Sequence, residues 1–136
     1  MFTISRQFTF CYAHRLLNYS GACSHPHGHN GLVRITLCSE TLNDAGMVVD
    51  FGNLKQTMGY WIEENLDHRM VLHPADPLVP VLKKMNEPVY LMTENPTAEC
   101  FAKLLFEQAV QFGFPVESVT FWETEKCFAE YRKESL

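Results

Sequence analysis

The stretch FTISRQFTFCYAHRL, residues 2–16, alternates apolar and polar side chains over most of its length, which is the pattern of a half-buried strand. Residues 32–39 alternate in the same way and predict a second strand, antiparallel to the first. Phe10 and Tyr12 share one face of the first strand, and His14 continues that face at the end of the stretch. A polar ring on an apolar face needs a partner, so other parts of the sequence should supply one for His14.

Downstream of these strands the apolar period lengthens to that of a helix. Apolar side chains in residues 53–67 recur at the spacing of an amphipathic helix. A short third strand is expected just before it, at residues 47–51. Residues 73–94 are rich in proline, and they predict a loop with at most a short strand at residues 89–92.

A second helix and a hairpin complete the chain. Asn95 supplies a polar cap and Pro96 a first helical position for a helix that ends at Gly113. Residues 116–124 and 127–132 predict a β-hairpin. This order of elements predicts an α+β fold in which two helices cover one face of an antiparallel sheet.

Length and composition limit the possible functions. A chain of 136 residues fits a single domain that spans residues 1–136. Its net charge of −5, without a run of Lys or Arg, argues against nucleic acid or an anionic membrane as a partner. A signal peptide and a membrane span are not expected, so the sequence predicts a cytoplasmic protein. Five scattered cysteines predict reduced thiols rather than a disulfide framework.

The stretch CSHPHGHN, residues 23–30, concentrates side chains that bind metals. His27 and His29 are two residues apart, so both rings project from the same face of an extended backbone. Gly28 between them allows a close approach. This pair predicts a metal chelate.

His14 is the candidate for a third ligand. Three neutral imidazoles leave one position of a zinc ion open, which is the coordination of catalytic zinc sites. The alternative is a closed structural zinc site formed by Cys23, His27, His29 and one further group. His25 has no decided role in either arrangement.

Four further residues with acid–base chemistry stand out. A nearby dication would favour the thiolate of Cys23, the form that accepts a proton. Asp67 lies at a helix C-terminus, where the helix dipole repels a carboxylate, but a hydrogen bond to His68 would explain both residues. Glu123 shares the strand phase of apolar neighbours, so it either meets a ligand or lies at an exposed strand end.

Six motifs, taken in chain order, resemble those of the 6-pyruvoyltetrahydropterin synthase and 6-carboxytetrahydropterin synthase family. They are Tyr-Ala-His at 12–14, Cys-x-x-x-His-Gly-His-Asn at 23–30, Val-Asp-Phe at 49–51, Leu-Asp-His at 66–68, Pro-Thr-Ala-Glu at 96–99 and Glu-Thr at 123–124. The resemblance implies the tunnelling fold (T-fold), in which sheets of several subunits join edge to edge into a barrel. Such a barrel is typically a homohexamer of two stacked trimers with active sites between subunits.

The resemblance also implies roles for three groups of residues. The zinc ligands would be His14, His27 and His29. The catalytic residues would be Cys23 as base or nucleophile, with Asp67 and His68 completing a proton relay. The substrate-binding residues would be Glu123, which holds the pterin ring, and Glu99, which assists it; Glu99 could instead be an acid favoured by the helix dipole. The chain departs from the family at Gly31, where an aromatic residue is frequent, and at residues 71–73, where Val-Leu-His replaces a Leu-Asn.

The implied enzyme is a zinc-dependent lyase that acts on 7,8-dihydroneopterin triphosphate. Three residues separate Cys23 from His27, and this spacing is similar to that of the carboxy-forming enzymes, which release acetaldehyde and triphosphate on the route to queuosine and other deazapurines. The alternatives are a pyruvoyl-forming enzyme of a tetrahydrobiopterin-type pathway, which keeps all carbons, and a zinc- or pterin-binding protein without turnover. Candidates for binding the triphosphate are Lys55, Arg15 and Arg69.

Overall fold

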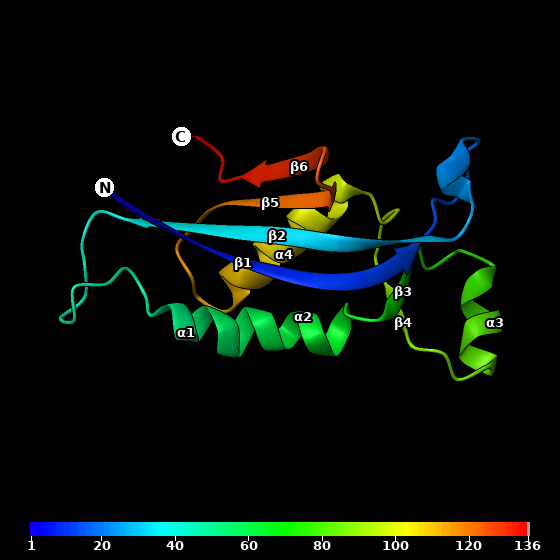
Figure 1. Cartoon of the computed structure of the whole chain (residues 1–136), viewed down its shortest axis with the longest axis horizontal. Helices are drawn as coiled ribbons and strands as arrows, with labels where there is room; N and C mark the ends of the chain where they lie inside the picture. The colour runs from blue at the N-terminus through cyan, green and yellow to red at the C-terminus, as the bar shows by residue number, and fades with distance from the viewer. Residues whose placement is uncertain (136) are drawn as a thin grey trace.

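The computed structural model describes residues 1–135, and two long strands form its centre (Figure 1). Strand β1 (Phe2–His14) and strand β2 (His27–Ser39) pair antiparallel along their whole lengths. The alternating pattern predicted both strands. Strand β2 begins at His27 rather than at residue 32, because its pairing with β1 continues through the polar residues that hide the alternation there. The two histidines of the chelate therefore lie within a strand.

Four shorter strands extend this centre on both sides. Strands β5 (Val116–Thr124) and β6 (Cys127–Arg132) form the predicted hairpin, and β5 pairs antiparallel with β2. Strands β3 (Arg69–Leu72) and β4 (Val89–Leu91) continue the sheet beyond β1 in parallel pairings. The sheet order is β4-β3-β1-β2-β5-β6. The sheet is thus mixed, not antiparallel throughout as expected, because β3 is too short to show an alternating pattern.

The first predicted helix is present as one continuous helical segment. It consists of α1 (Phe51–Leu54), a π-helical stretch η2 (Lys55–Gly59) and α2 (Tyr60–Asn65). The strand expected at residues 47–51 is absent, and that prediction was wrong. Val48 and Val49 instead pack irregularly against the core, and the Asp50 side chain caps the helix by accepting a hydrogen bond from the Gly52 amide at 2.7 Å.

The second predicted helix is α4 (Ala98–Gln111), and its N-cap is Thr97 rather than Asn95. The Thr97 hydroxyl accepts a hydrogen bond from the Cys100 amide at 3.2 Å. The expected loop at residues 73–94 contains the predicted strand β4 and also an unpredicted helix, α3 (Leu78–Lys84). Two of the prolines that indicated a loop lie at the start of α3, Pro77 as its N-cap and Pro80 in its first turn, where the missing amide hydrogens are not needed.

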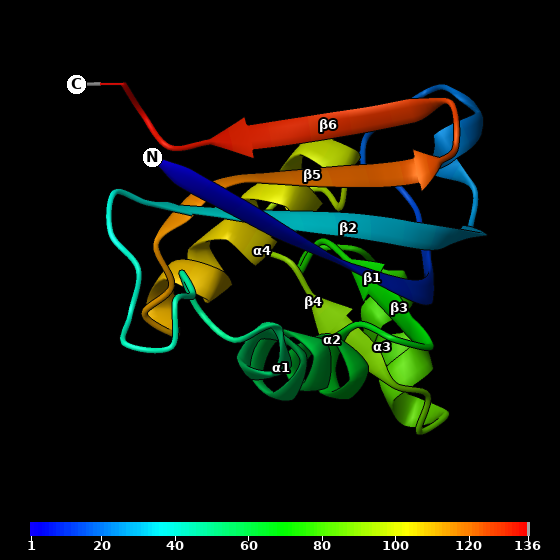
Figure 2. The same ribbon diagram turned by 60° about the vertical axis from the view of Figure 1, so that its left-hand side comes forward.

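The helices α1, α2 and α4 close the core against one face of the curled sheet (Figure 2). Fully buried side chains from both layers form this core, among them Leu54, Met58, Phe101, Leu105, Ile35 and Phe121. Each such side chain contributes about 1.5–3 kcal/mol of transfer free energy when it leaves water. This burial makes the β1–β2 pair a rigid platform. Within residues 1–135 there is no helix with the length and apolar character needed to cross a membrane.

Candidate functional site

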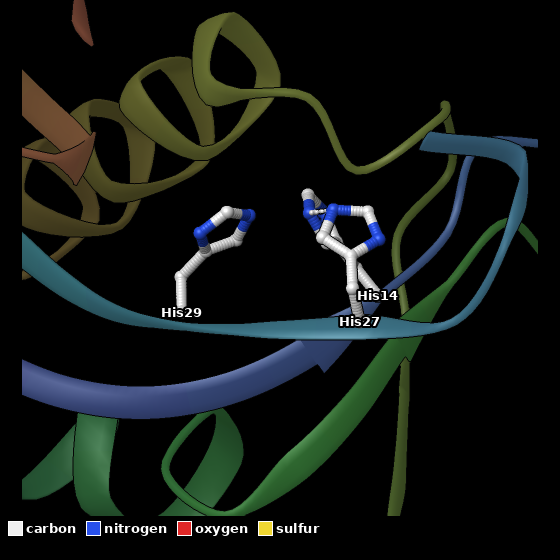
Figure 3. Close-up of side chains that lie close together, drawn as sticks. All are labelled: His14, His27 and His29. Atoms are coloured by element: carbon white, nitrogen blue, oxygen red, sulfur yellow. Dashed lines mark hydrogen bonds between the residues drawn. The ribbon is translucent and has the colours of Figure 1, made fainter. Parts of the chain in front are cut away.

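Three histidines meet where β1 ends and β2 begins. The strand register places His14 opposite His27 and Tyr12 opposite His29, so the three imidazoles project from the same face of the β1–β2 pair. Figure 3 shows the rings on the side of the sheet where α4 lies. One ring nitrogen from each histidine lies within 4.8 Å of those from the other two. The structure therefore brings together the three histidines that the sequence suggested as metal ligands.

Two backbone carbonyls fix the proton positions on these rings. The Nδ1 atom of His14 donates to the Pro96 carbonyl and the Nδ1 atom of His27 donates to the His25 carbonyl, each at 2.7 Å. Since a carbonyl oxygen only accepts, both Nδ1 atoms carry hydrogen and a neutral ring has its lone pair on Nε2. These two Nε2 atoms face each other at 3.0 Å. With both rings neutral, the two lone pairs repel each other at this distance unless a cation lies between or beside them.

A proton is a poor candidate for that cation. Burial lowers the pKa of His14 to about 4, an effect that the Pro96 carbonyl only partly offsets and that the other two histidines reinforce. Burial also lowers the pKa of His29, against the opposing charge of Glu123. The Nε2 atom of His29 is buried and lacks a hydrogen-bond partner among residues 1–135. Burial thus favours neutral imidazoles at His14 and His29, and these two rings together with His27 fit a borderline divalent metal ion such as zinc.

The carbonyl that orients His14 is itself held in place. Asn95 accepts a hydrogen bond from the Leu17 amide at 2.8 Å and donates to the Leu17 carbonyl at 2.9 Å. These two bonds fasten the segment before α4 to the segment that follows β1. Pro96, the next residue, is buried. The His14 ring therefore has a supported partner, as ligand histidines of metal sites generally do.

Cys23 lies in the connection between β1 and β2, in a short 3-10 turn, η1 (Ala22–Ser24). Its thiol is half-buried, and its carbonyl accepts a hydrogen bond from the Leu16 amide at 2.8 Å. Cys23 is not part of the group formed by the three histidines. The structure thus does not assemble the closed structural site in which Cys23 would be a fourth ligand.

Glu123 is half-buried on β5 and lies close enough to the histidines to influence them. Its charge raises the pKa of His29 and adds to the larger effect of burial on Tyr12, whose pKa is raised well above its usual range. Its carboxylate can therefore meet a ligand that also reaches the histidines. Glu99, in contrast, is exposed in the first turn of α4, where the helix dipole favours its carboxylate.

Gly31 stands where the motif that the chain resembles frequently has an aromatic residue, and the structure gives a steric reason for the glycine. A Cβ atom at Gly31 would lie 3.0 Å from ring atoms of both Tyr12 and Phe121. The ring of Tyr12 thus occupies space that a side chain at position 31 would need. Tyr12 is buried, and its ring centroid is 5.1 Å from that of His14 and 5.6 Å from that of His29. No sequence pattern had assigned Tyr12 to the site, although Tyr12 shares the strand phase of His14.

Asp67 and His68 form a second group with Cys11, directly after α2. The His68 Nδ1 atom lies 2.7 Å from Asp67 Oδ2, so the hydrogen bond expected between the two residues is present. The other Asp67 oxygen accepts from the Cys11 amide at 3.1 Å, and the Cys11 thiol lies 3.5 Å from His68 Nε2. His68 adopts a left-handed backbone conformation with φ of 58°, which is strained for a residue with a side chain. Nothing in the sequence singled out Cys11.

This second group does not join the three histidines of its own chain. Successive side chains of a strand point to opposite faces, and Cys11 and His14 are separated by an odd number of positions. Asp67 and His68 accompany Cys11 and therefore lie on the face of β1 away from His14. One chain assembles the metal-ligand set and the carboxylate–imidazole pair at two separate places.

The three candidates for binding a triphosphate differ in whether their side chains already bond to other residues of the chain. Arg15 forms a buried ion pair with Asp76 and holds the pKa of that carboxyl below its usual range, with an Nε–Oδ2 distance of 2.8 Å. The guanidinium of Arg69 donates to the Glu64 carbonyl at 2.8 Å. Lys55 is exposed. Arg15 thus has a structural role, and Lys55 is the more accessible cation.

Sequence comparison connects the chain to characterised proteins. A profile of the 6-pyruvoyl tetrahydropterin synthase family matches residues 3–134. A 6-carboxy-5,6,7,8-tetrahydropterin synthase of Rickettsia bellii is 32% identical, with 96% of this chain and 99% of that protein aligned. Both similarities cover nearly the whole chain.

Solved structures agree with this picture. An uncharacterized protein from Wolinella succinogenes superimposes with a TM-score of 0.79 at 28% identity, with 98% of each chain covered. The 6-pyruvoyl tetrahydropterin synthase of Caenorhabditis elegans superimposes with a TM-score of 0.75 at 27% identity, with 98% of this chain and 96% of that chain covered. The expected fold is therefore confirmed at the level of the whole chain.

Proposed function

The chain belongs to the 6-pyruvoyl tetrahydropterin synthase family, and we propose that it is a zinc-dependent 6-carboxy-5,6,7,8-tetrahydropterin synthase. This lyase converts 7,8-dihydroneopterin triphosphate to 6-carboxytetrahydropterin, acetaldehyde and triphosphate, on the route to queuosine and other deazapurines. The observation that carries the proposal is the pair of Nε2 atoms of His14 and His27, which face each other 3.0 Å apart. The Rickettsia bellii relative supports the carboxy-forming activity.

The metal site and the pterin site lie next to each other in this proposal. When bound by His14, His27 and His29, zinc would polarise the hydroxyls of the substrate side chain and so acidify the neighbouring C–H and O–H bonds. Glu123 accepts hydrogen bonds from the 2-amino group and the ring N–H of the pterin, a two-donor edge that matches a carboxylate. Glu99 has the weaker support, because it is exposed on α4, and we assign it an assisting role only.

Residues from two regions take part in proton transfer: the connection between β1 and β2, and the segment directly after α2. Cys23, in the connection between the two strands that carry the histidines, takes a proton from the substrate as a thiolate. Asp67 holds the tautomer and orientation of His68 through their 2.7 Å hydrogen bond, and His68 relays the proton. Because the pair lies on the opposite face of β1 from the histidines, we propose that it serves the site of a neighbouring subunit.

An oligomer follows from this arrangement. We propose a homohexamer built as two stacked trimers, in which the outer strands β4 and β6 of each sheet pair with neighbouring subunits. Lys55, exposed on the α1–α2 helix, is the favoured residue for binding the triphosphate. The enzyme is expected to be cytoplasmic and to act on a small molecule, without nucleic acid or membrane as a partner.

A second candidate activity is the formation of 6-pyruvoyltetrahydropterin. It is favoured by the structural similarity to the Caenorhabditis elegans enzyme, at a TM-score of 0.75. Both activities begin with the same substrate and the same acidified bonds. They differ in whether two carbons leave the side chain.

Mass spectrometry of the products after incubation of zinc-loaded protein with 7,8-dihydroneopterin triphosphate distinguishes these functions. Acetaldehyde and a 6-carboxy pterin are expected. A 6-pyruvoyl product would establish the second candidate, and unchanged substrate would contradict both.

The Cys23→Ala variant provides the matching control. It should retain zinc and lose product formation. Loss of zinc in this variant would instead indicate that Cys23 is a ligand of a closed site.

A further inference from the structure

The hydroxyl of Tyr12 is a buried polar group that makes no hydrogen bond within residues 1–135. Tyr12 has an exposed fraction of 3%, and its hydroxyl has no hydrogen-bond partner among the residues that the structure describes. Burying a hydroxyl without a partner is unfavourable, and proteins rarely do so without a reason. The ring itself could be packed equally well by phenylalanine, so packing does not explain the hydroxyl.

The ring of Tyr12 is held firmly in its position. Its centroid lies 4.7 Å from that of Phe101 on α4 and 5.5 Å from that of Phe10 on the same strand. Gly31 on the neighbouring strand leaves room for it, since a Cβ there would come within 3.0 Å of the Tyr12 ring. Because tyrosine has only two side-chain torsions, a fixed ring gives its hydroxyl a fixed place.

The surroundings of the hydroxyl indicate what its missing partner is. The His29 ring lies 5.6 Å away, centroid to centroid, and its Nε2 atom, which the proposed metal would engage, also lacks a hydrogen-bond partner among residues 1–135. Glu123 directly follows Trp122, which pairs with Leu32, so it lies beside Gly31, where the Tyr12 ring fills the space of a missing side chain. A hydroxyl donor and a carboxylate thus lie beside the proposed metal site. A ligand that reaches both must offer a hydrogen-bond acceptor to the hydroxyl and donors to the carboxylate.

A pterin ring has this combination of groups. Its 2-amino group and N3–H form the donor edge that suits Glu123, and an acceptor flanks that edge on either side, namely N1 and the C4 oxygen. We propose that Tyr12 is a substrate-binding residue whose hydroxyl donates a hydrogen bond to one of these two acceptors. The inference rests on the proposed pterin site and adds a ring-recognising residue to it.

Tyr12→Phe removes the hydroxyl and keeps the ring, so it tests the proposal directly. The probe for binding is neopterin, the oxidised pterin that does not react, with the dissociation constant measured by the quenching of its fluorescence. The variant should bind neopterin about 3–10-fold more weakly, as expected for one lost hydrogen bond. The KM for the dihydroneopterin triphosphate substrate should rise by a similar factor, while zinc content stays at the wild-type level.

A melting curve of the ligand-free protein gives a second, independent measurement. Because Tyr12→Phe removes an unpaired buried hydroxyl, the ligand-free variant should melt at the same temperature as the wild type or higher. Neopterin should raise its melting temperature less than it raises that of the wild type. Tyr90→Phe is the matched control, since Tyr90 is also partly buried but packs on Trp61, and it should leave neopterin binding unchanged.

Three results would overturn the proposal. Equal neopterin affinity of wild type and Tyr12→Phe would remove the role of the hydroxyl, while the proposed function would stand. A clear fall in the melting temperature of the ligand-free variant would show that the hydroxyl already has a protein partner, for example Glu123. Failure of the wild type itself to bind neopterin would overturn both this inference and the proposed function.

Discussion

The two clusters of chemically active side chains differ in how completely one chain builds them. The three histidines lie on the helix-covered face of β1 and β2, where two carbonyls fix the rings of His14 and His27. The pair Asp67–His68 lies on the opposite face, and its histidine side chain is 77% exposed. The first cluster is preorganised to bind a metal within a single chain. The second has an imidazole that Asp67 orients and that is largely exposed to solvent.

The two clusters therefore differ in whether they depend on assembly. Metal binding should be a property of the isolated chain, whereas proton relay should require a neighbour that covers the exposed histidine. The left-handed backbone of His68 supports this reading, because strained conformations persist at functional positions. Substitutions in one cluster should therefore leave the other intact.

Replacing a ligand histidine should abolish the first cluster. His27→Ala should reduce bound zinc from about one ion per chain to nearly none and lower product formation by roughly 10³-fold or more. Metal analysis by mass spectrometry and a product assay measure the two effects. The matched control is His25→Ala, two residues earlier and exposed, whose carbonyl rather than side chain contacts His27. Zinc retained in His27→Ala would contradict the assigned ligand set.

Replacing the carboxylate of the second cluster should affect activity alone. Asp67→Asn removes the negative charge that orients His68, so kcat should fall by about 10²–10⁴-fold while zinc content remains unchanged. Steady-state kinetics and metal analysis test this together, with Asp44→Asn as a control at an exposed loop position. If zinc were lost as well, the two clusters would not be independent.

The pKa of His14 makes the metal-free protein sensitive to acid. Its folded pKa of about 4 lies below the unfolded value of 6.5, so the unfolded chain binds the proton more readily. This contribution to stability is complete above pH 6.5 and disappears as the pH falls toward 4. It amounts to about 3 kcal/mol.

Urea unfolding of metal-free protein at several pH values measures this dependence. Between pH 4 and pH 6.5, the free energy of unfolding should change less steeply with pH in His14→Gln than in the wild type. An identical slope in both proteins would show that His14 is not the group responsible.

The smallest effect is expected at the cap of α4. Thr97→Ala removes the hydroxyl that accepts from the Cys100 amide, and should lower the free energy of unfolding by about 1 kcal/mol. Zinc content should not change, because the Asn95 bonds to Leu17 still position the Pro96 carbonyl. A loss of zinc from this variant would mean that the support of His14 depends on the helix itself.

The sequence predicted the parts of the site that depend on local patterns. Strand alternation placed His14 in phase with Tyr12, and the two-residue spacing placed His27 and His29 on one face. Both expectations need only the geometry of an extended chain. The helix residues and the C-terminal hairpin were predictable for the same reason.

Other features depend on tertiary contacts that no sequence pattern predicts. The carbonyls of Pro96 and His25 orient two rings, but any residue type has a carbonyl. Strand β3 and helix α3 are too short for a periodic signal, so the parallel side of the sheet was missed. The separation of Asp67 and His68 from the histidines follows from the parallel pairing of β3 with β1, which only the folded chain reveals.

The most direct test of the account combines the two defective variants in one oligomer. Tagged His27→Ala and untagged Asp67→Asn chains are co-expressed, and the mixed assembly is purified and assayed. If the histidines of one chain work with the Asp67–His68 pair of another, random 1:1 mixing should restore roughly a quarter of the wild-type activity, although each variant alone is inactive. A mixed assembly as inactive as its two parents would contradict a site shared between chains.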